Sequence, residues 1–497
     1  KKMTQVTNEL NIVRPRDWNS YEEEREKLTK LVNNFRTPTF EYAIPENLKN
    51  LESKAYEKFE KMREEEKKRF VSKGFFPPGE GFYKYKDQYE NEALFKLIKK
   101  FPKGALLHCH WLACGDNNVM IKDLIGGENC YIFEGEDNKE VRHGTIRFFE
   151  NAPNDDWKKF DDVRTKELEE KIFNACTFNE ADETGTSENR WKRFQAIFDK
   201  YYMKIKFHEP IFKKQFQHVV DINVEDNIQY MEYNMHVGDQ IYRKDQSKLD
   251  VDEHMAVLLA CEKEAKEKHP DSWFGSRLIH EHLRFFDQAF IRKHIEISYY
   301  LQNKYPEHCV AFDLVGEEDT GKSALYYAKD MLEFSSKARS ENKNFKLRLH
   351  GGETDWQTEN LTDLVLLDSP RIGHGYSLFR FPVLMDIIKS KNTCLEISPI
   401  SNQVLGLVRD LRNHPVAEYL CRGVPLVLSN DDPAIFGTGG ASYDWYSVTM
   451  ACELNLLQLR KFAENSIRHA FLSSSERDAL FALWLKKYEI FLRNFVN

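Results

Sequence analysis

Short apolar runs alternate with long amphipathic stretches through most of the chain. After residue 100 there are eight such runs, at 104–110, 228–234, 276–282, 309–315, 345–350, 370–372, 393–397 and 424–428. Strands that alternate with helical segments indicate right-handed crossovers and a parallel sheet. Eight units of this kind predict a closed barrel. The predicted fold class is therefore α/β, a (β/α)8 TIM-type barrel.

Two segments depart from this alternation. Residues 21–34 and 45–71 carry runs of Glu, Lys and Arg with apolar residues at three- and four-residue spacing, which predicts an N-terminal helical extension over residues 1–101. From about 123 to 188 the sequence is polar and punctuated by glycines, and it is too long for a plain connection in a compact domain. We expect an inserted subdomain there, within a barrel domain of residues 102–497.

Composition and charge exclude several classes of protein. The chain has 497 residues, with 72 Lys and Arg against 80 Asp and Glu, and a formal net charge of −8. This acidic balance and the lack of a clustered basic face argue against a nucleic-acid partner. No apolar run approaches the ~18–20 residues of a membrane-spanning helix. The nine cysteines form no CxxC pair, which argues against a zinc ribbon or a Cys-ligated deaminase site.

Histidines and carboxylates follow four of the predicted strands. The first strand ends in His108 and His110, which lie two residues apart and therefore on the same face of an extended chain. The fifth ends at His350, the sixth at His374 and the eighth at Asp431. Alone, each motif has a structural explanation as a turn or a packing feature. Because the carboxyl ends of barrel strands meet at one face, the four together predict a metal site.

The ligand types predict one Zn²⁺ per chain. Three histidines and one carboxylate are borderline nitrogen and oxygen ligands that suit Zn²⁺ and leave a position for water. Such an ion lowers the pKa of water to about 7, so the predicted reaction class is metal-assisted hydrolysis of a small molecule. In this scheme Glu353 protonates a substrate nitrogen, His374 orients or deprotonates the attacking hydroxide, and Asp432 presents its carboxylate to the substrate.

Longer motifs surround these residues. They are HCH at 108–110, HGGETDW at 350–356, RIGHG at 371–375, ISPISNQ at 397–403 and SNDDPA at 429–434. Together they resemble the adenosine deaminase superfamily over about residues 20–495. DLVGEEDTG at 313–321 and DLRNHPV at 410–416 resemble in particular its extracellular branch, the adenosine deaminase growth factors.

The resemblance implies a role for each site residue. Glu353 would donate a proton to purine N1, and His374 would assist the attack on C6. Gly352 and Asp432 would hydrogen-bond the purine ring, and Trp191 would line the pocket. The implied reaction converts adenosine and water into inosine and ammonia. The implied zinc ligands are His108, His110, His350 and Asp431.

The resemblance also implies an assembly and a compartment. Members of this branch dimerise through the N-terminal helices, carry an insert that corresponds to about 122–189 here, and are usually secreted. The chain starts without an apolar leader, which is typical of a cytosolic protein or equally of a mature secreted one. Cys130 matches one half of the branch's insert disulfide, and Cys176 is a candidate substitute for the other half.

Some positions depart from the branch's pattern. The acid that holds a ribose hydroxyl in the branch is Trp111 here, and a family histidine is replaced by Glu317. Two family arginines are replaced by Asn234 and Leu283, whereas His282 matches an active-site histidine on the third strand. We therefore expect Trp111, Glu317 and His282 to border the substrate, with the departures grouped at its ribose end.

Three functions remain open at this stage. The intact metal set and the purine-side residues favour a deaminase of adenosine or a similar nucleoside. Trp111, Glu317 and Asn234 favour a zinc deaminase of another aminated heterocycle, such as a free base, a pterin or a modified nucleoside. The third alternative is a growth-factor-like signalling protein with vestigial catalysis, and the complete ligand set argues against it.

Overall fold

A computed structural model describes residues 15–35, 38–137, 141–238 and 240–497. Its centre is a barrel of parallel strands, arranged as two four-stranded sheets in the orders β1-β5-β6-β7 and β11-β10-β9-β8. Isolated parallel bridges from Phe312 to Leu347 and from Cys109 to Asp431 join the two sheets at both seams. The predicted (β/α)8 barrel is therefore confirmed. The strands are β1 Gly104–Leu106, β5 Ile228–Met235, β6 Gly275–Leu283, β7 Cys309–Val315, β8 Leu349–Gly351, β9 Arg371–His374, β10 Cys394–Ile397 and β11 Leu426–Leu428.

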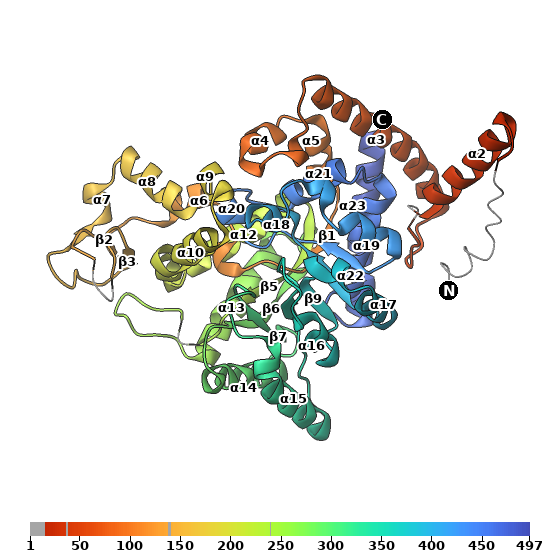
Figure 1. The fold of residues 1–497 in the computed structure, drawn as a ribbon. Coiled ribbons are helices and arrows are strands. Elements are labelled where there is room, and N and C mark those ends of the chain that lie inside the picture. The colour runs from red at the N-terminus through yellow and green to blue at the C-terminus, as the bar shows by residue number, and fades with distance from the viewer. Residues whose placement is uncertain (1–14, 36–37, 138–140, 239) are drawn as a thin grey trace.

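Helices cover the outside of the barrel (Figure 1). Asp250 caps α13 by accepting from Glu253 N, and Asp287 caps α14 by accepting from Phe290 N. Their apolar stripes face the strands, as the complete burial of Ile291 in α14 illustrates. Among the described residues, no helix is both long and apolar enough to cross a membrane. The helices are α12 Glu209–Glu225, α13 Val251–Lys268, α14 Gln288–Lys304, α15 Ala324–Glu341, α16 Asn360–Leu366, α17 Pro382–Lys391, α19 Val416–Arg422 and α22 Leu456–His469.

Short elements fill the connections. Four of them follow a barrel strand and so belong to the end of the barrel where the strands finish. These four are η2 Trp111–Ala113 after β1, η5 Tyr376–Arg380 after β9, α18 Pro399–Val404 after β10 and α20 Pro433–Phe436 after β11. The others are η1 Pro77–Gly79, α6 Asn117–Val119, η3 Met120–Leu124, η4 Phe198–Tyr202, α11 Met203–Ile205, η6 Leu411–Asn413 and α21 Ser442–Ala451.

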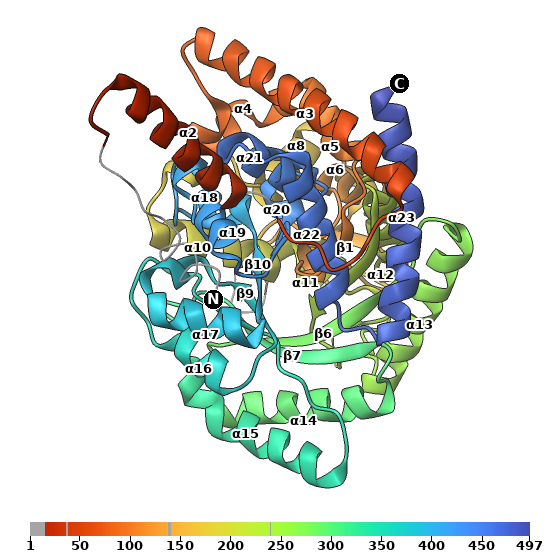
Figure 2. The same cartoon turned by 90° about the vertical axis from the view of Figure 1, so that its right-hand side faces the viewer.

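The described part of the N-terminal region is helical, and its two longer helices begin and end within three residues of the predicted 21–34 and 45–71. Residues 1–14 and 36–37 of the predicted extension lie outside the described residues. The second helix, α3, packs against the C-terminal helix α23 (Figure 2). Glu52 of α3 accepts a hydrogen bond from Tyr488 of α23 at 2.6 Å and pairs with Arg460 at 3.2 Å. The first helix, α2, projects away from the body of the molecule (Figure 1). These elements are α2 Trp18–Phe35, α3 Glu46–Ser72, α4 Phe82–Tyr89, α5 Ala93–Lys100 and α23 Ser474–Val496.

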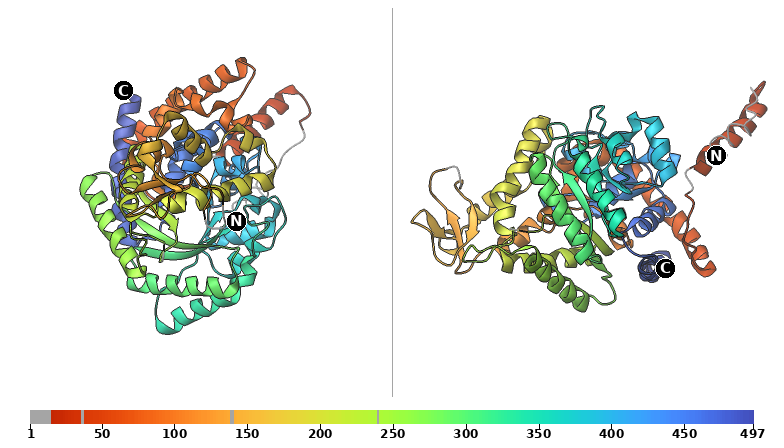
Figure 3. Two further views of the ribbon diagram at one scale, coloured as in Figure 1. Left: turned by 90° about the vertical axis from the view of Figure 1, so that its left-hand side faces the viewer. Right: turned by 90° about the horizontal axis from the view of Figure 1, so that it is seen from below.

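The segment predicted as an insert contains a three-stranded antiparallel sheet in the order β3-β2-β4. This sheet lies at the end of the molecule opposite α2 (Figure 3). Cys130 and Cys176 are both free and buried, so the candidate substitute disulfide is not formed. The chain then returns to the barrel through α10. The elements are β2 Cys130–Phe133, β3 Ile146–Phe148, β4 Trp157–Lys159, α7 Phe160–Val163, α8 Lys166–Cys176, α9 Glu180–Thr184 and α10 Ser187–Ile197.

Candidate active site

The four residues predicted as metal ligands lie together where the strands end. His108 and His110 follow β1, whereas His350 lies in β8. Asp431 follows β11, and its carbonyl accepts from His110 N at 3.0 Å. Asp431 Oδ1 is 3.1 Å from His108 Nε2 and 3.3 Å from His110 Nε2. The ligand atoms of all four residues lie within 4.8 Å of one another, so they could hold one ion.

The spacing of these atoms fits a metal ion. Two ligands of a tetrahedral Zn²⁺, each ~2.0–2.1 Å from the ion, are about 3.3 Å apart, close to the two distances above. His108 Nε2 and Asp431 Oδ1 are buried and have no hydrogen-bond partner among the described residues. Because a buried polar atom without a partner is costly, a cation between them accounts for both. The imidazole and carboxylate donors also suit Zn²⁺.

Each of the three histidine rings has a carboxylate on the side that faces away from the other ligands. The carboxylate oxygen faces ring nitrogen Nδ1, which directs Nε2 toward the shared point. Outer carboxylates of this kind fix the tautomer and orientation of a metal-binding imidazole and raise its basicity. The pairs are His110 with Glu281 at 2.8 Å, His350 with Asp313 at 2.8 Å and His108 with Glu396 at 3.2 Å.

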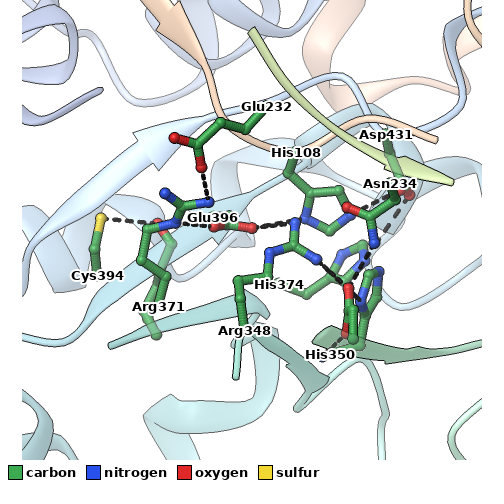
Figure 4. A network of polar contacts seen from close by, with 12 residues as sticks. His108, Glu232, Asn234, Arg348, His350, Arg371, His374, Cys394, Glu396 and Asp431 are labelled. Atoms are coloured by element: carbon green, nitrogen blue, oxygen red, sulfur yellow. Dashed lines mark hydrogen bonds and ion pairs between the residues drawn. The ribbon is translucent and has the colours of Figure 1, made fainter. Parts of the chain in front are cut away.

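Two buried arginines compensate the charge of two of these carboxylates, Asp313 and Glu396 (Figure 4). Arg348 lies between Asp313 and Glu396 and pairs with both. Arg371 pairs with the other oxygen of Glu396 at 2.6 Å and with Glu232 at 2.6 Å. Burial would raise the pKa of Glu396, but the two guanidinium groups hold it well below its ordinary value. The carboxylate facing His108 therefore stays ionised at neutral pH.

Three acidic side chains at the site differ in protonation. Burial would raise the pKa of Asp431, but the imidazoles of His374 and His108 hold it well below its ordinary value. Burial and the charge of Asp431 raise the pKa of Asp432 and of Glu353 well above the ordinary values. The ionised form of Asp431 and the protonated forms of Asp432 and Glu353 are therefore favoured. When their surroundings give neighbouring carboxyl groups different pKa values, one group can act as an acid and another as a base in the same site.

His374 ends β9 in an unusual backbone conformation. Its φ is +64°, and that of Asp431 is +57°, in the left-handed region that residues other than glycine rarely adopt. Such strain persists only where the surroundings hold it, and it clusters at functional sites. His374 Nε2 lies 3.6 Å from Glu353 Oε1 and 3.9 Å from Asp431 Oδ2. Burial lowers the pKa of His374 to about 3, so its ring is neutral.

Two glycines make room for this arrangement. A Cβ on Gly373 would lie 3.1 Å from His350 Cγ and 3.2 Å from His108 Cε1, closer than most real contacts. Gly352 has a φ of +75°, which favours glycine, and it turns the chain between His350 and Glu353. The predicted contact of Gly352 with the purine would therefore be made by its backbone.

A cavity opens beside the candidate metal site. Its polar groups include Glu353, His374 and Asp432, and its apolar wall includes Trp191 of α10. Trp191 and Asp432, both predicted to contact the substrate, therefore lie on its wall. A largely apolar wall with a few convergent polar groups suits a flat heterocycle. The other apolar lining residues are Leu112, Phe194, Phe198, Met203, Leu283, Val315 and Leu405.

Trp111 does not line this cavity, contrary to expectation. Its side chain is completely buried and packs against Phe212 and Phe216 of α12, with ring centroids 5.0 Å and 5.6 Å away, and against Tyr233 at 6.0 Å. After His110 the chain leaves the extended conformation and enters η2, which turns Trp111 toward the surrounding helices. Trp111 is therefore part of the packing around the barrel, and its position gives no support to the expected contact with the substrate.

Glu317 and His282 also lie outside the cavity lining. Glu317 bonds within its own loop, where Thr320 Oγ1 donates to it. The next residue, Glu318, accepts a hydrogen bond from Glu353 N at 3.1 Å and so positions the predicted proton donor. His282 stacks on His236 with ring centroids 4.9 Å apart. Of these two histidines, His236 lines the cavity.

Sequence reasoning missed the three carboxylates behind the histidines. Asp313 and Glu396 lie inside strands that are otherwise apolar, and Glu281 lies in the buried strand β6 between two histidines. This was a usable signal, because charged residues are almost never fully buried unless they are paired. Two residues that depart from the branch pattern also lie at the site. Asn234 donates to Asp313 at 2.6 Å, and Leu283 lies on the cavity wall.

Comparison with known sequences gives one consistent result. The sequence profile of the adenosine deaminase family matches residues 174–486. The chain is 34% identical over 441 residues to adenosine deaminase 2-A of Danio rerio, which covers 83% of this chain and 85% of the relative. It is 32% identical over 435 residues to adenosine deaminase 2 of Homo sapiens, covering 84% and 83%. It is 31% identical over 430 residues to adenosine deaminase 2 of Dictyostelium discoideum, covering 85% and 79%.

Solved structures with low sequence identity share the fold. A zinc-bound amidohydrolase of Burkholderia ambifaria superposes with a TM-score of 0.59 at 15% identity, covering 81% of this chain and 94% of that one. An adenine deaminase of Arthrobacter aurescens gives a TM-score of 0.53 at 17% identity, covering 78% and 98%. At these identities the likeness supports the barrel architecture and does not assign a substrate.

Proposed function

Because this chain belongs to the adenosine deaminase family of metal-dependent purine deaminases, we propose that its substrate is adenosine or a closely similar purine nucleoside. The 6-amino group is replaced by oxygen, and the products are inosine and ammonia. One observation carries the proposal: the four-residue metal cluster and the carboxyl groups of Glu353 and Asp432, whose pKa values are raised, converge on one cavity with an apolar wall.

We assign one Zn²⁺ per chain to this cluster. When bound, the ion lowers the pKa of a water molecule to about 7 and so supplies hydroxide at neutral pH. The outer carboxylates keep Nε2 of each histidine turned toward it. His374, whose Nε2 lies 3.9 Å from Asp431 Oδ2, is near enough to hydrogen-bond the attacking oxygen. The assigned ligands are His108, His110, His350 and Asp431.

Glu353 moves the protons of the reaction. Its carboxyl group, whose raised pKa favours the protonated form, donates to ring nitrogen N1 and makes C6 more electrophilic. After the oxygen of water has added to C6, the Glu353 carboxylate takes the proton of the new hydroxyl group and passes it to the amino group. The C6–N bond then breaks, ammonia leaves with the bonding electron pair, and C6 keeps its oxygen as a carbonyl. The proton that water lost on becoming hydroxide returns to the Glu353 carboxylate and restores it for the next turnover.

The cavity wall orients the purine. Asp432, whose raised pKa favours the protonated donor form, reaches a nitrogen of the five-membered ring, and the backbone of Gly352 bonds the six-membered ring. Trp191 covers the ring and excludes water. His236 and Glu281 also line the cavity, and His236 Nδ1 is buried without a hydrogen-bond partner among the described residues, so this pair is available to the sugar hydroxyls.

The test is an ultraviolet absorbance assay on a panel of adenosine, 2′-deoxyadenosine, adenine and an aminated pterin. We expect turnover of adenosine, loss of turnover with a chelator, and recovery when Zn²⁺ is added back. Turnover of adenine or the pterin in the absence of nucleoside turnover would contradict the substrate and favour the heterocycle alternative. A zinc-loaded protein that turns over none of the four would favour the signalling alternative.

We further propose a homodimer through the N-terminal helices of residues 1–101, with catalysis in residues 102–497 and an insert at about 122–189. The support is an exposed apolar face on α2: Trp18, Tyr21 and Leu28 are 68%, 46% and 42% exposed. Light scattering of the double variant Tyr21→Lys, Leu28→Lys should give the monomer mass. The control Glu23→Lys changes another face of α2 and should leave a dimer, whereas a monomeric parent would contradict the proposal.

The proposed compartment is the extracellular space. This proposal rests on the resemblance to the extracellular branch of the family. Assay of adenosine turnover in the culture medium and in the lysate of cells that express the natural gene would test it. Activity confined to the lysate would contradict secretion.

A further inference from the structure

His374 is held from behind by a chain of buried polar groups. Its Nδ1 lies 3.4 Å from the side-chain nitrogen of Asn402. The side-chain oxygen of Asn402 lies 3.0 Å from His414 Nε2. His414 Nδ1 in turn accepts a hydrogen bond from the backbone N–H of Val416 at 3.2 Å. The three side chains are at most 3% exposed, so water does not interrupt the chain.

The backbone N–H of Val416 sets the direction of every bond in this chain. A backbone N–H can only donate, so His414 Nδ1 must accept and cannot carry a proton. Burial lowers the pKa of His414 to about 3, so its ring is neutral and its proton is on Nε2. His414 Nε2 therefore donates to Asn402, which must present its oxygen there. Asn402 then has only its NH2 group to offer to His374.

We propose that Val416, His414 and Asn402 form a relay that fixes the tautomer of His374, with Nδ1 accepting from Asn402 and the proton on Nε2. His374 then faces the site as a hydrogen-bond donor. It donates to the oxygen that attacks the substrate and does not take a proton from it. This inference rests on the proposed function for the identity of that oxygen, but the tautomer itself follows from the relay.

The groups that face His374 Nε2 can accept the hydrogen bond that this tautomer donates. Nε2 lies 3.6 Å from Glu353 Oε1 and 3.9 Å from Asp431 Oδ2; the ionised Asp431 can accept from it, and so can the oxygen of the Glu353 carboxyl group that carries no proton. With Nε2 already protonated, His374 cannot serve as the general base. Proton transfer is then left to Glu353, which cycles between N1, the new hydroxyl group and the leaving amine. Asn402 and His414 are positioning residues, since they act through His374.

The direct test observes the tautomer without turnover. Protein labelled with ¹⁵N-histidine gives ring-nitrogen correlations, and the signals of His374 are those missing in His374→Gln. We expect a protonated Nε2 and an unprotonated Nδ1, in both metal-free and zinc-loaded protein. A protonated Nδ1 would overturn the relay even if adenosine is the substrate. Failure of the substrate assignment leaves this spectrum unchanged, so the two failures are distinguishable.

A variant tests whether the relay matters for catalysis. Asn402→Asp keeps the shape but offers only acceptors when ionised, so it should draw the proton of His374 to Nδ1 and reverse the spectrum. Losing a hydrogen-bond donor to the reacting oxygen should lower kcat by about 10²-fold with little change in KM. Asn413→Asp makes the same chemical change at an exposed neighbour and should leave both unchanged. Reduced turnover with an unreversed spectrum would overturn the proposal, and so would a reversed spectrum with parental turnover.

Discussion

Glu281 tests whether the outer carboxylates hold the metal. Its Oε2 lies 2.8 Å from His110 Nδ1, and the side chain is 6% exposed. Glu281→Gln keeps the shape and one acceptor oxygen but removes the charge. A hydrogen bond to a charged group is worth about 1.5–3 kcal/mol and a neutral one about 0.5–1.5 kcal/mol, so the loss is about 1–1.5 kcal/mol. That corresponds to about tenfold weaker metal binding, at the lower end of the range for such partners.

The assay is zinc titration of the metal-free protein in competition with a chelating dye. The matched control is Glu262→Gln, which changes a carboxylate of the same exposure on α13, beside the first residues of β6. Glu262 accepts from Ser276 N at 3.0 Å and from Ser276 Oγ at 2.7 Å, and it does not line the cavity. We expect the control to bind zinc as the parent does. Parental affinity in Glu281→Gln, or an equal loss in the control, would refute the reasoning.

Three further predictions concern catalysis, packing and pH. Glu353→Gln keeps hydrogen bonding but cannot donate a proton, so kcat should fall by roughly 10²–10⁴-fold with the metal content unchanged, and near-parental kcat would contradict its role. Trp111→Ala should cost about 3–5 kcal/mol of unfolding free energy in urea, because it empties a closed aromatic cluster, and a parental midpoint would contradict that packing. Burial lowers the pKa of His208 to about 4 and those of His254 and His469 to about 3, below the ~6.5 of the unfolded chain. As pH falls, the unfolded state therefore binds more protons than the folded state. The free energy of unfolding should be highest above pH ~6.5 and should decrease progressively toward pH ~4. A urea midpoint that stays constant from pH 7.5 to 4.5 would contradict this.

The barrel and its ligand positions could be predicted because both depend on local patterns. β7 was predicted at its observed bounds, since a short apolar run between helical segments is the signature of a buried parallel strand. His108 and His110 share a face through the two-residue period of an extended chain. The other ligands follow from the rule that barrel strands finish at one end. Each of these inferences needs only the neighbouring sequence and the topology.

The contacts around the ligands could not be predicted in the same way. Trp111 is one residue from His110, yet it points away from the cavity, because the chain turns into η2 at that residue and ends the alternation of faces. The carboxylate behind His110 comes from β6, 171 residues further along the chain. Pairings of this kind depend on barrel closure, which sequence spacing does not specify.

The sequence by itself determined the barrel and predicted the four candidate ligands and the candidate acid Glu353, because hydrophobic period and strand ends are local properties. Only the tertiary structure decided which groups lie behind the ligands and which way their hydrogen bonds run. In a buried series of hydrogen bonds, a backbone N–H can only donate, so it fixes the direction of the bonds linked to it. In the relay behind His374 that donor is the backbone N–H of Val416, 42 residues from the ring whose proton it places.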